Sequence, residues 1–447
     1  MSEYTLIIAA AAGISLLLFL VIRTKLHAFV ALLLVSLFVG IATGMPLNEV
    51  VQSIQTGMGE TLGFVAVVVG LGAMFGQMME ISGGADRLAR TLIKKFGPDK
   101  VPWALGVTGF LIGIPIFFDV GFIILIPIVY RLAKKTGRSL LHYAIPLFAG
   151  LSVAHSFIPP TPGPIIVANL IGADLGWVIL FGTIAGIPAM IIAGPLFGKY
   201  IAKKIHISLP NYMDTEEIED DQELPSFGLI VTIILVPLVL ILLNTFSTVI
   251  FPEGNIIRTI CTFLGHPFVA LLISTLLVFY LLGVKNGYSN QEIQAIASKS
   301  LEPAGMIILV TGAGGIFKQV LIDTGVGRVL ADTMATSPLP PIFLAFLIAS
   351  IIRIAQGSAT VAMVTATSLM SPLTSTLGFE GPVLGLIVIS IAAGATIASH
   401  VNDSGFWLIN RYLGLDVKDT LRSWTVMETI CSLVAFSIVF IISWFIT

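Results

Sequence analysis

The sequence predicts an all-α polytopic membrane protein, made of two inverted repeats of five transmembrane helices that each contain one re-entrant hairpin and one broken helix. Composition is the first observation behind this fold class. Of 447 residues, 56% are hydrophobic and 11% are charged, against about 25% charged residues in a soluble domain. The mean hydropathy of +1.01 excludes a water-soluble fold, because a chain of this length could not bury so much apolar surface.

The second observation is a series of apolar runs about as long as the 20 residues that cross a bilayer. Uninterrupted runs cover about 4–22, 27–44, 61–81, 176–198, 227–250, 264–284, 300–321 and 423–445. The first run is too long for a signal-peptide core and has no basic region before it, so we expect it to be retained as a helix.

Four further apolar segments are interrupted near their middle. They are 101–130, broken at Gly113-Ile114-Pro115; the segment from about 141, broken at 158–164 (IPPTPGP); 340–372, broken at 356–360 (QGSAT); and 382–410, broken at 400–405 (HVNDSG). Non-helical backbone at membrane depth is tolerated only where protein or water covers it. The breaks therefore predict a wet cavity lined by protein.

Basic residues predict the orientation. Segment 101–130 has basic clusters on both sides, namely Arg87, Arg90, Lys94, Lys95 and Lys100 before it and Arg131, Lys134, Lys135 and Arg138 after it. The positive-inside rule places both clusters in the cytoplasm, so this segment is predicted to be a re-entrant hairpin. The resulting topology has both termini outside. It places 19 of the 23 Lys and Arg in the cytoplasm, Arg258 and Arg328 outside, and Lys318 and Arg353 in the membrane.

The third observation is internal similarity. FGQMMEISGGADRLART (75–91) aligns with FKQVLIDTGVGRVLADT (317–333). AGLSVA (149–154) aligns with AGATIA (393–398) at a similar offset. The predicted organisation is a first repeat at 1–205 with its cytoplasmic hairpin at 101–130, an acidic cytoplasmic linker at 206–226, and a second repeat at 227–447 with an outside hairpin at 340–372. Inverted repeats with broken helices are typical of secondary transporters, which bind substrate near the membrane midplane.

Arg353 is the most informative single residue, because a guanidinium within a membrane segment is costly and marks function by default. Its planar fork suits a carboxylate, although it could instead form an internal ion pair that holds the hairpin. Gln356, Ser358 and Thr360 follow it at the predicted turn. They would bind a polyhydroxylated ligand or only satisfy the backbone of the turn.

The half-helices that follow the breaks should present free N–H groups and partial positive charge to an anion. Thr161, Asn402 and Ser404 lie at these breaks. They are candidate substrate ligands, and the alternative is that they only cap the half-helices.

Asp119 is the only acid in the first hairpin, and it is the first candidate for a proton carrier, since a desolvated carboxyl can take up a proton. The alternative is a salt bridge to Arg353. Asp403 and His400 are further candidates, whereas we expect His155 to be a satisfied core residue. Interfacial roles are expected for Glu80, Lys318 and Asp323.

The sequence contains no metal-ligand spacing, Walker motif or nucleophile elbow. It therefore predicts no metal, cofactor, ATP-driven transport or nucleic-acid partner, and Cys261 and Cys431 are interpreted as packing residues. The glycines of TGAGGIF (311–317) are expected to pack helices closely. A passive channel and a polytopic membrane enzyme remain alternatives, the latter weak because the breaks offer no nucleophile and base.

Several motifs together resemble the gluconate permease family of bacterial proton symporters, within the ion-transporter superfamily. They are GGADRLARTLIKKFG (83–97), FFDVGFIILIP (117–127), IPPTPGP (158–164), GAGGIFKQVLIDTGVG (312–327), IRIAQGSATVA (352–362) and SHVNDSGFWL (399–408). The resemblance implies proton-coupled uptake of D-gluconate or a related sugar acid across the inner membrane by a homodimer. It also implies scaffold and transport subdomains, for which we expect elevator-like alternating access.

Two positions depart from the family pattern. Asp119 stands where family members often have Glu, and Thr161 stands where they often have His. If that histidine usually carries the proton, this chain must use another group. The family also includes a D-serine transporter subgroup, so D-serine or another hexonate is an alternative substrate.

Overall fold

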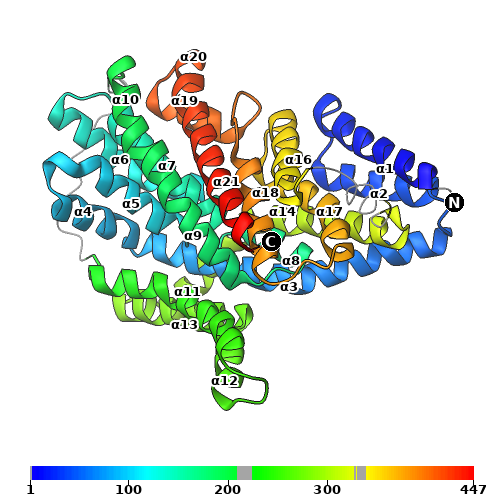
Figure 1. Cartoon of the computed structure of the whole chain (residues 1–447). Coiled ribbons are helices and arrows are strands. Elements are labelled where there is room, and N and C mark those ends of the chain that lie inside the picture. Colours follow the sequence, from blue (N-terminus) through cyan, green and yellow to red (C-terminus); the bar gives the residue numbers. More distant parts are fainter. Residues whose placement is uncertain (1–2, 209–223, 327–328, 330–338, 447) are drawn as a thin grey trace.

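The computed structural model describes residues 3–208, 224–326, 329 and 339–446, and this part of the chain is helical throughout, without a strand (Figure 1). Eight helices or helix pairs within it are long and apolar enough to cross a membrane. The predicted all-helical polytopic membrane protein is confirmed. The acidic run 214–223 and Arg328 lie outside the described residues.

The first half contains ten α-helices in its described part. Their bounds are α1 (Glu3–Leu18), α2 (Ala28–Ala42), α3 (Leu47–Ile81), α4 (Gly84–Phe96), α5 (Val101–Gly113), α6 (Phe118–Thr136), α7 (Leu141–Phe157), α8 (Pro162–Ile171), α9 (Leu175–Ile191) and α10 (Phe197–Lys204). Short π segments extend α1 and join α9 to α10.

The described part of the second half repeats much of this order. It contains α11 (Phe227–Ile250), α12 (Ile256–Leu264), α13 (Pro267–Val278), α14 (Asn290–Asp323), α16 (Pro341–Gln356), α17 (Ala359–Thr376), α18 (Pro382–Thr396), α19 (Ser404–Leu413), α20 (Val417–Thr420) and α21 (Val426–Ile446). Short α12 projects away from the other helices (Figure 1).

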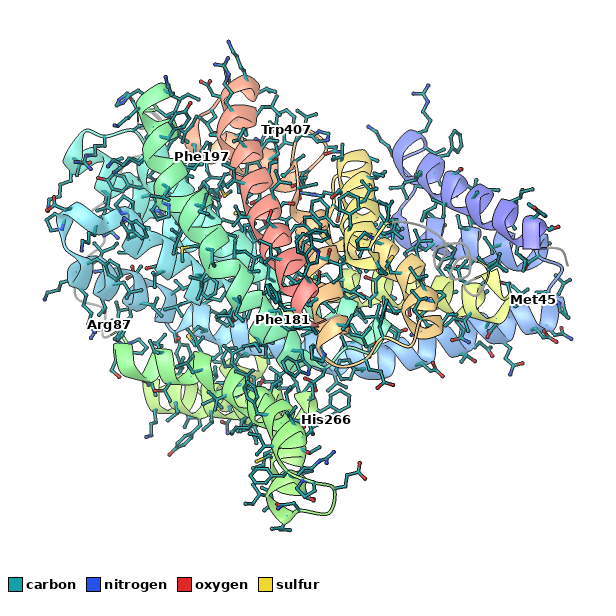
Figure 2. The ribbon with its side chains drawn as sticks, viewed as in Figure 1. Met45, Arg87, Phe181, Phe197, His266 and Trp407 are labelled. Carbon is teal, nitrogen blue, oxygen red and sulfur yellow. The ribbon has the colours of Figure 1, made fainter. Side chains whose placement is uncertain are left out.

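Helices α3 and α14 are much longer than the runs predicted at 61–81 and 300–321. They have 35 and 34 residues, about 50 Å at 1.5 Å per residue, against a bilayer core of about 30 Å. Hydropathy alone missed their polar first turns; α14 begins at a capping box between Ser289 and Glu292. Figure 2 shows Met45, just before α3, and Arg87, just after it, at opposite ends of the molecule.

Glycines bring α3 and α14 into close contact. A Cβ atom on Gly57 would lie 2.6 Å from the carbonyl oxygen of Gly315, and one on Gly315 would lie 2.7 Å from that of Gly57. Real Cβ contacts essentially never come so close. The expectation that the glycines of 311–317 pack helices is confirmed.

All four predicted breaks interrupt helices. The chain leaves helical structure between α5 and α6, between α7 and α8, between α16 and α17, and between α18 and α19. The second break is shorter than the predicted 158–164, because Pro162 and Pro164 lie in the first turn of α8, where a missing N–H costs no hydrogen bond. The fourth break, predicted at 400–405, begins earlier, at Ile397.

Candidate functional site

A cavity of about 360 Å³ lies beside three of the four helix breaks, those between α5 and α6, α16 and α17, and α18 and α19. Its walls come from the start of α6, from α7, from the α16–α17 turn, from the α18–α19 break, and from the start of α21 with the π turn before it. Eight of the ten predicted site residues line it, namely Asp119, Arg353, Gln356, Ser358, Thr360, Asn402, Asp403 and Ser404. His400 and Thr161 do not.

Arg353 forms an ion pair inside this site. Its side chain is 4% exposed, and Nη2 lies 2.6 Å from Oδ2 of Asp403. Nη1 donates to the carbonyl oxygen of Gly357, while Nε is buried and has no hydrogen-bond partner in the described part of the chain. The predicted alternative of an internal ion pair is therefore present. Its acid is Asp403, and no ion pair with Asp119 is found among the described residues.

Asp403 is the centre of a hydrogen-bond chain. Its Oδ2 accepts from the Ser399 hydroxyl as well as from Arg353, and its Oδ1 accepts from the Gly405 amide at 3.1 Å, which caps α19. Ser399 in turn accepts from Nε1 of Trp424 at 2.7 Å. This chain fixes the α18–α19 break to the end of α16 and to the start of the last span.

The α16–α17 turn packs tightly against the α18–α19 break. Gly357 has φ +90°, and a Cβ there would lie 2.7 Å from the carbonyl carbon of Asn402, so only glycine fits. Nδ2 of Asn402 and Nε2 of His400 each lie 2.9 Å from the carbonyl oxygen of Ile354. They therefore satisfy a carbonyl that the last turn of α16 leaves unpaired.

Two of the predicted turn residues also make internal hydrogen bonds. Gln356 donates from Nε2 to the Ser358 carbonyl at 2.7 Å, and Ser358 accepts from the Val361 amide to cap α17. By contrast, Thr360 and Ser404 face the cavity, and no hydrogen bond to their hydroxyls is found within the described residues. Their hydroxyls are therefore available to a solute.

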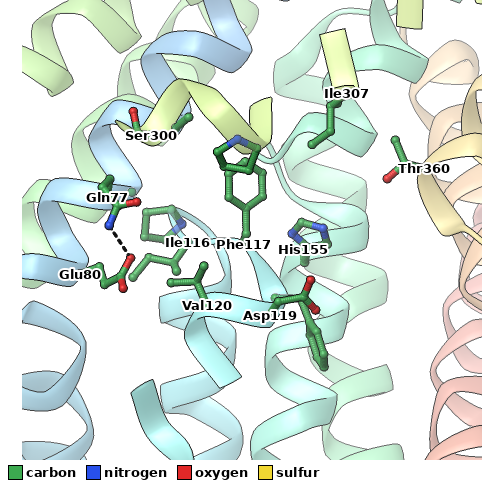
Figure 3. A pocket seen from close by; sticks show the side chains of 15 residues that line it. Gln77, Glu80, Ile116, Phe117, Asp119, Val120, His155, Ser300, Ile307 and Thr360 are labelled. Atoms are coloured by element: carbon green, nitrogen blue, oxygen red, sulfur yellow. Dashed lines mark hydrogen bonds between the residues drawn. The ribbon is translucent and has the colours of Figure 1, made fainter. Parts of the chain in front are cut away.

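Asp119 is the other available group. It lies in the first turn of α6, where the helix dipole favours a negative charge. No hydrogen bond or ion pair holds its carboxylate within the described part of the chain. It also lines a second cavity of about 320 Å³ between α6, α3 and α14, which Figure 3 shows with Asp119 next to His155. The two cavities share Phe118, Asp119, His155 and Thr360.

His155 differs from its predicted role. It lines both cavities, and its buried Nδ1 has no hydrogen-bond partner among the described residues. The expectation of a satisfied core histidine is therefore wrong. Its ring makes an edge contact with Phe117, at 6.2 Å between centroids.

Thr161 lies apart from both cavities. It occupies the N-cap position of α8, but its hydroxyl does not cap the helix and donates instead to the Ile158 carbonyl at 2.6 Å. The residue instead lines a void of about 10 Å³. The predicted contact between Thr161 and substrate stays a prediction.

The sequence interpretation missed Glu428 of α21, which is 3% exposed. With Ser152 of α7 it lines the cavity of about 360 Å³, which we call the main cavity. A signal was available, because Glu428 is the only charged residue in the apolar run 423–445. That is the same argument that singled out Arg353. No group of three or more His, Cys, Asp or Glu that could hold a metal is found in the described ranges.

Comparison with known structures finds a similar fold. The crystal structure of the YdaH transporter of Alcanivorax borkumensis matches with a TM-score of 0.66 over 92% of this chain and 97% of the other. The sequences are 14% identical, so this likeness concerns the fold alone.

Sequence comparisons are more specific. Residues 4–445 match the model of the GntP family permeases. A gluconate permease of Pseudomonas aeruginosa is 43% identical, covering 96% of this chain and 95% of the relative. A low-affinity gluconate transporter and an L-idonate transporter of Escherichia coli K12 are 42% and 40% identical, each match covering 96% of both chains. The resemblance and the prediction of a membrane transporter rather than an enzyme are confirmed, and the chain belongs to the GntP family of permeases.

Proposed function

We propose that this permease imports D-gluconate, or another hexonate, by symport with protons across the bacterial inner membrane. The observation that carries the proposal is the polar cavity at the helix breaks, where one buried guanidinium, unpartnered hydroxyls and several carboxyl groups face the same space. The relatives named for gluconate and idonate support a sugar acid as the substrate.

The cavity can hold both parts of a sugar acid. Arg353 and the N–H groups at the start of α17 and α19 would attract the carboxylate. The hydroxyls of Thr360 and Ser404, with the polar side chains of Gln356, Ser358 and Asn402, would bind the hydroxyl groups. Recognition of a hydroxylated chain explains why so many polar groups line a space within a membrane protein.

The charge in the cavity supports coupling to protons. Arg353 brings one positive charge, while Asp119, Asp403 and Glu428 bring three negative charges when ionised, so their formal sum is −2. A monovalent sugar acid would make it −3. The repulsion between the substrate anion and these carboxylates falls when one of them takes up a proton. Binding of substrate and binding of a proton therefore favour each other. Asp119 is the first proposed carrier, because none of the described residues forms a hydrogen bond or ion pair with it, and Asp403 and His400 are reserves.

The proposed mechanism is elevator-like movement within a fold of two inverted repeats, 1–205 and 227–447, joined by the cytoplasmic linker 206–226 and with both termini outside. The recurring order of a long helix, a helix pair and a broken helix in both halves supports it. So does the second cavity, which separates the start of α6 from the long helices α3 and α14. A homodimer is part of the proposal.

The test is accumulation of radiolabelled gluconate in a host without its own gluconate transporters. Accumulation above the external concentration, abolished by a protonophore, is expected. Equilibration without accumulation would point to a passive channel. A competition panel of gluconate, L-idonate and D-serine decides the substrate, and inhibition by D-serine alone would overturn the proposal of a sugar acid.

A further inference from the structure

Glu428 is a buried acid that takes no part in the Arg353–Asp403 ion pair and caps no described helix. It lies in α21, within the span Val417–Ile446, and is 3% exposed. It lines the main cavity, and its Oε1 has no hydrogen-bond partner in the described part of the chain. Its side chain interacts with that of Ser152 on α7.

The groups around Glu428 leave it without a cation of its own. Arg353 on α16 and Asp403 at the α18–α19 break interact with it electrostatically, but Arg353 is bound to Asp403 and to Gly357. Cys431 is its titratable neighbour on α21. Asp119 and His155 face it from the cavity walls on α6 and α7. Helices α9 and α18, which also pack against α21, contain no titratable residue.

A substrate anion in this cavity would bring a further negative charge near the Glu428 carboxylate. The repulsion between two such charges is strong where water is scarce. A proton taken up by Glu428 removes this repulsion. It also turns the carboxylate into a carboxyl group whose O–H can donate a hydrogen bond to the substrate carboxylate or to a substrate hydroxyl. When the substrate leaves, the repulsion no longer holds the proton in place, so the same O–H bond can break.

We propose that Glu428 binds a proton together with the substrate anion and so contributes to the coupling between them. The proton comes from water on the side where substrate binds, and it returns to water on the side of release. This inference rests on the proposed function, in which one proton accompanies each substrate anion, so Glu428 shares that proton with Asp119.

The experiment is isothermal titration of the purified, detergent-solubilised permease with gluconate, in two buffers of different ionisation enthalpy. The difference in heat gives the protons taken up per gluconate bound. We expect the wild type to bind protons together with gluconate. Glu428→Gln should bind fewer protons per gluconate than the wild type, by at most one. Since one coupled proton changes Kd by up to tenfold per pH unit, Kd should also depend less on pH in this variant.

Glu253→Gln is the control, because Glu253 lies on the surface near α12 with a side chain that is 93% exposed. It should keep the wild-type proton count. An unchanged count in Glu428→Gln, with a similar change of Kd at every pH, would mean a structural role and would overturn the inference. If Glu428→Gln does not fold, Glu428→Asp replaces it. A shifted pH profile of Kd is then expected, and an unshifted one contradicts the inference. Absence of gluconate binding by the wild type would instead defeat the proposed function itself.

Discussion

The two predicted hairpins end in turns of opposite character. At the α16–α17 turn nearly every polar group is used within the protein: Arg353 binds Asp403, and Gln356 and Ser358 satisfy the backbone of the turn. At the α5–α6 turn the chain is apolar from Gly113 to Phe118, and the carboxylate of Asp119 that follows has no partner among the described residues.

This difference teaches how to assign roles to polar residues at membrane depth. A group held by several internal bonds shapes the cavity, and replacing it should damage both stability and binding. A group that faces the same cavity without a partner can be replaced without damage to the fold, so its loss should appear in transport alone. The predictions below test this division.

The largest effect is expected for Arg353→Ala. The change leaves Asp403, whose side chain is 14% exposed, without its cation; breaking a fully buried pair costs about 3–5 kcal/mol, which is the upper limit here. Gluconate binding should be abolished, and the Tm should fall. The double variant Arg353→Ala/Asp403→Ala should regain part of the lost stability while binding stays absent. Wild-type affinity in the single variant would remove Arg353 from the site.

The next effect concerns Gly357→Ala, which adds a Cβ where the backbone of Asn402 is in contact. Gly378→Ala is the matched control, because Gly378 also has a positive φ but its Cβ would meet nothing within 4 Å. Backbone strain costs about 1–3 kcal/mol at either position, and the contact adds to it only at Gly357. A lower Tm for Gly357→Ala than for Gly378→Ala is therefore expected. Equal values would show that the turn does not press on the break.

A smaller change in stability, but a clear change in transport, is expected for Asp119→Asn. No hydrogen bond or ion pair to another described residue is lost, so the Tm should stay near that of the wild type. Uptake driven by a pH gradient should fall about tenfold or more, while exchange of internal for external gluconate continues. Loss of exchange together with net uptake would contradict a role in proton coupling.

The smallest effects are expected for Thr360→Val and Ser404→Ala. Each removes one hydroxyl that has no partner among the described residues, and a hydrogen bond contributes about 1 kcal/mol, so Kd for gluconate should rise about fivefold. Thr183→Val is the control, since the Thr183 hydroxyl donates to the Ile179 carbonyl on α9 and lines neither of the two cavities. A Kd unchanged in both cavity variants would argue against direct contact with the substrate.

Much of this architecture could be predicted from the sequence, because a bilayer restricts a chain to few solutions. Apolar length predicted most of the candidate spans, and Gly, Pro and polar clusters within apolar runs predicted the four breaks. Arg353 was found because a charge in such a run is conspicuous. The polar first halves of α3 and α14 were missed, since hydropathy does not report helix where residues such as Asn48 and Glu60 interrupt an apolar face.

Pairing was the part that sequence could not predict. The sequence indicated Asp119 as the alternative ion-pair partner of Arg353. In the structure Arg353 pairs with Asp403, 50 residues further along the chain. Such choices depend on how turns pack in three dimensions, as Gly357 packs on Asn402. His155 was assigned to the core because the sequence does not show which residues of α7 face a cavity, whereas Glu428 could have been found by the argument that found Arg353.

The most direct test is uptake of gluconate by proteoliposomes that contain the purified permease, with a pH gradient and a membrane potential imposed separately. One proton and one monovalent sugar acid carry no net charge together. The account therefore predicts accumulation of up to about tenfold per unit of pH gradient, which is worth about 1.4 kcal/mol. A potential alone should drive none. Strong accumulation driven by potential at zero pH gradient would contradict one-to-one symport.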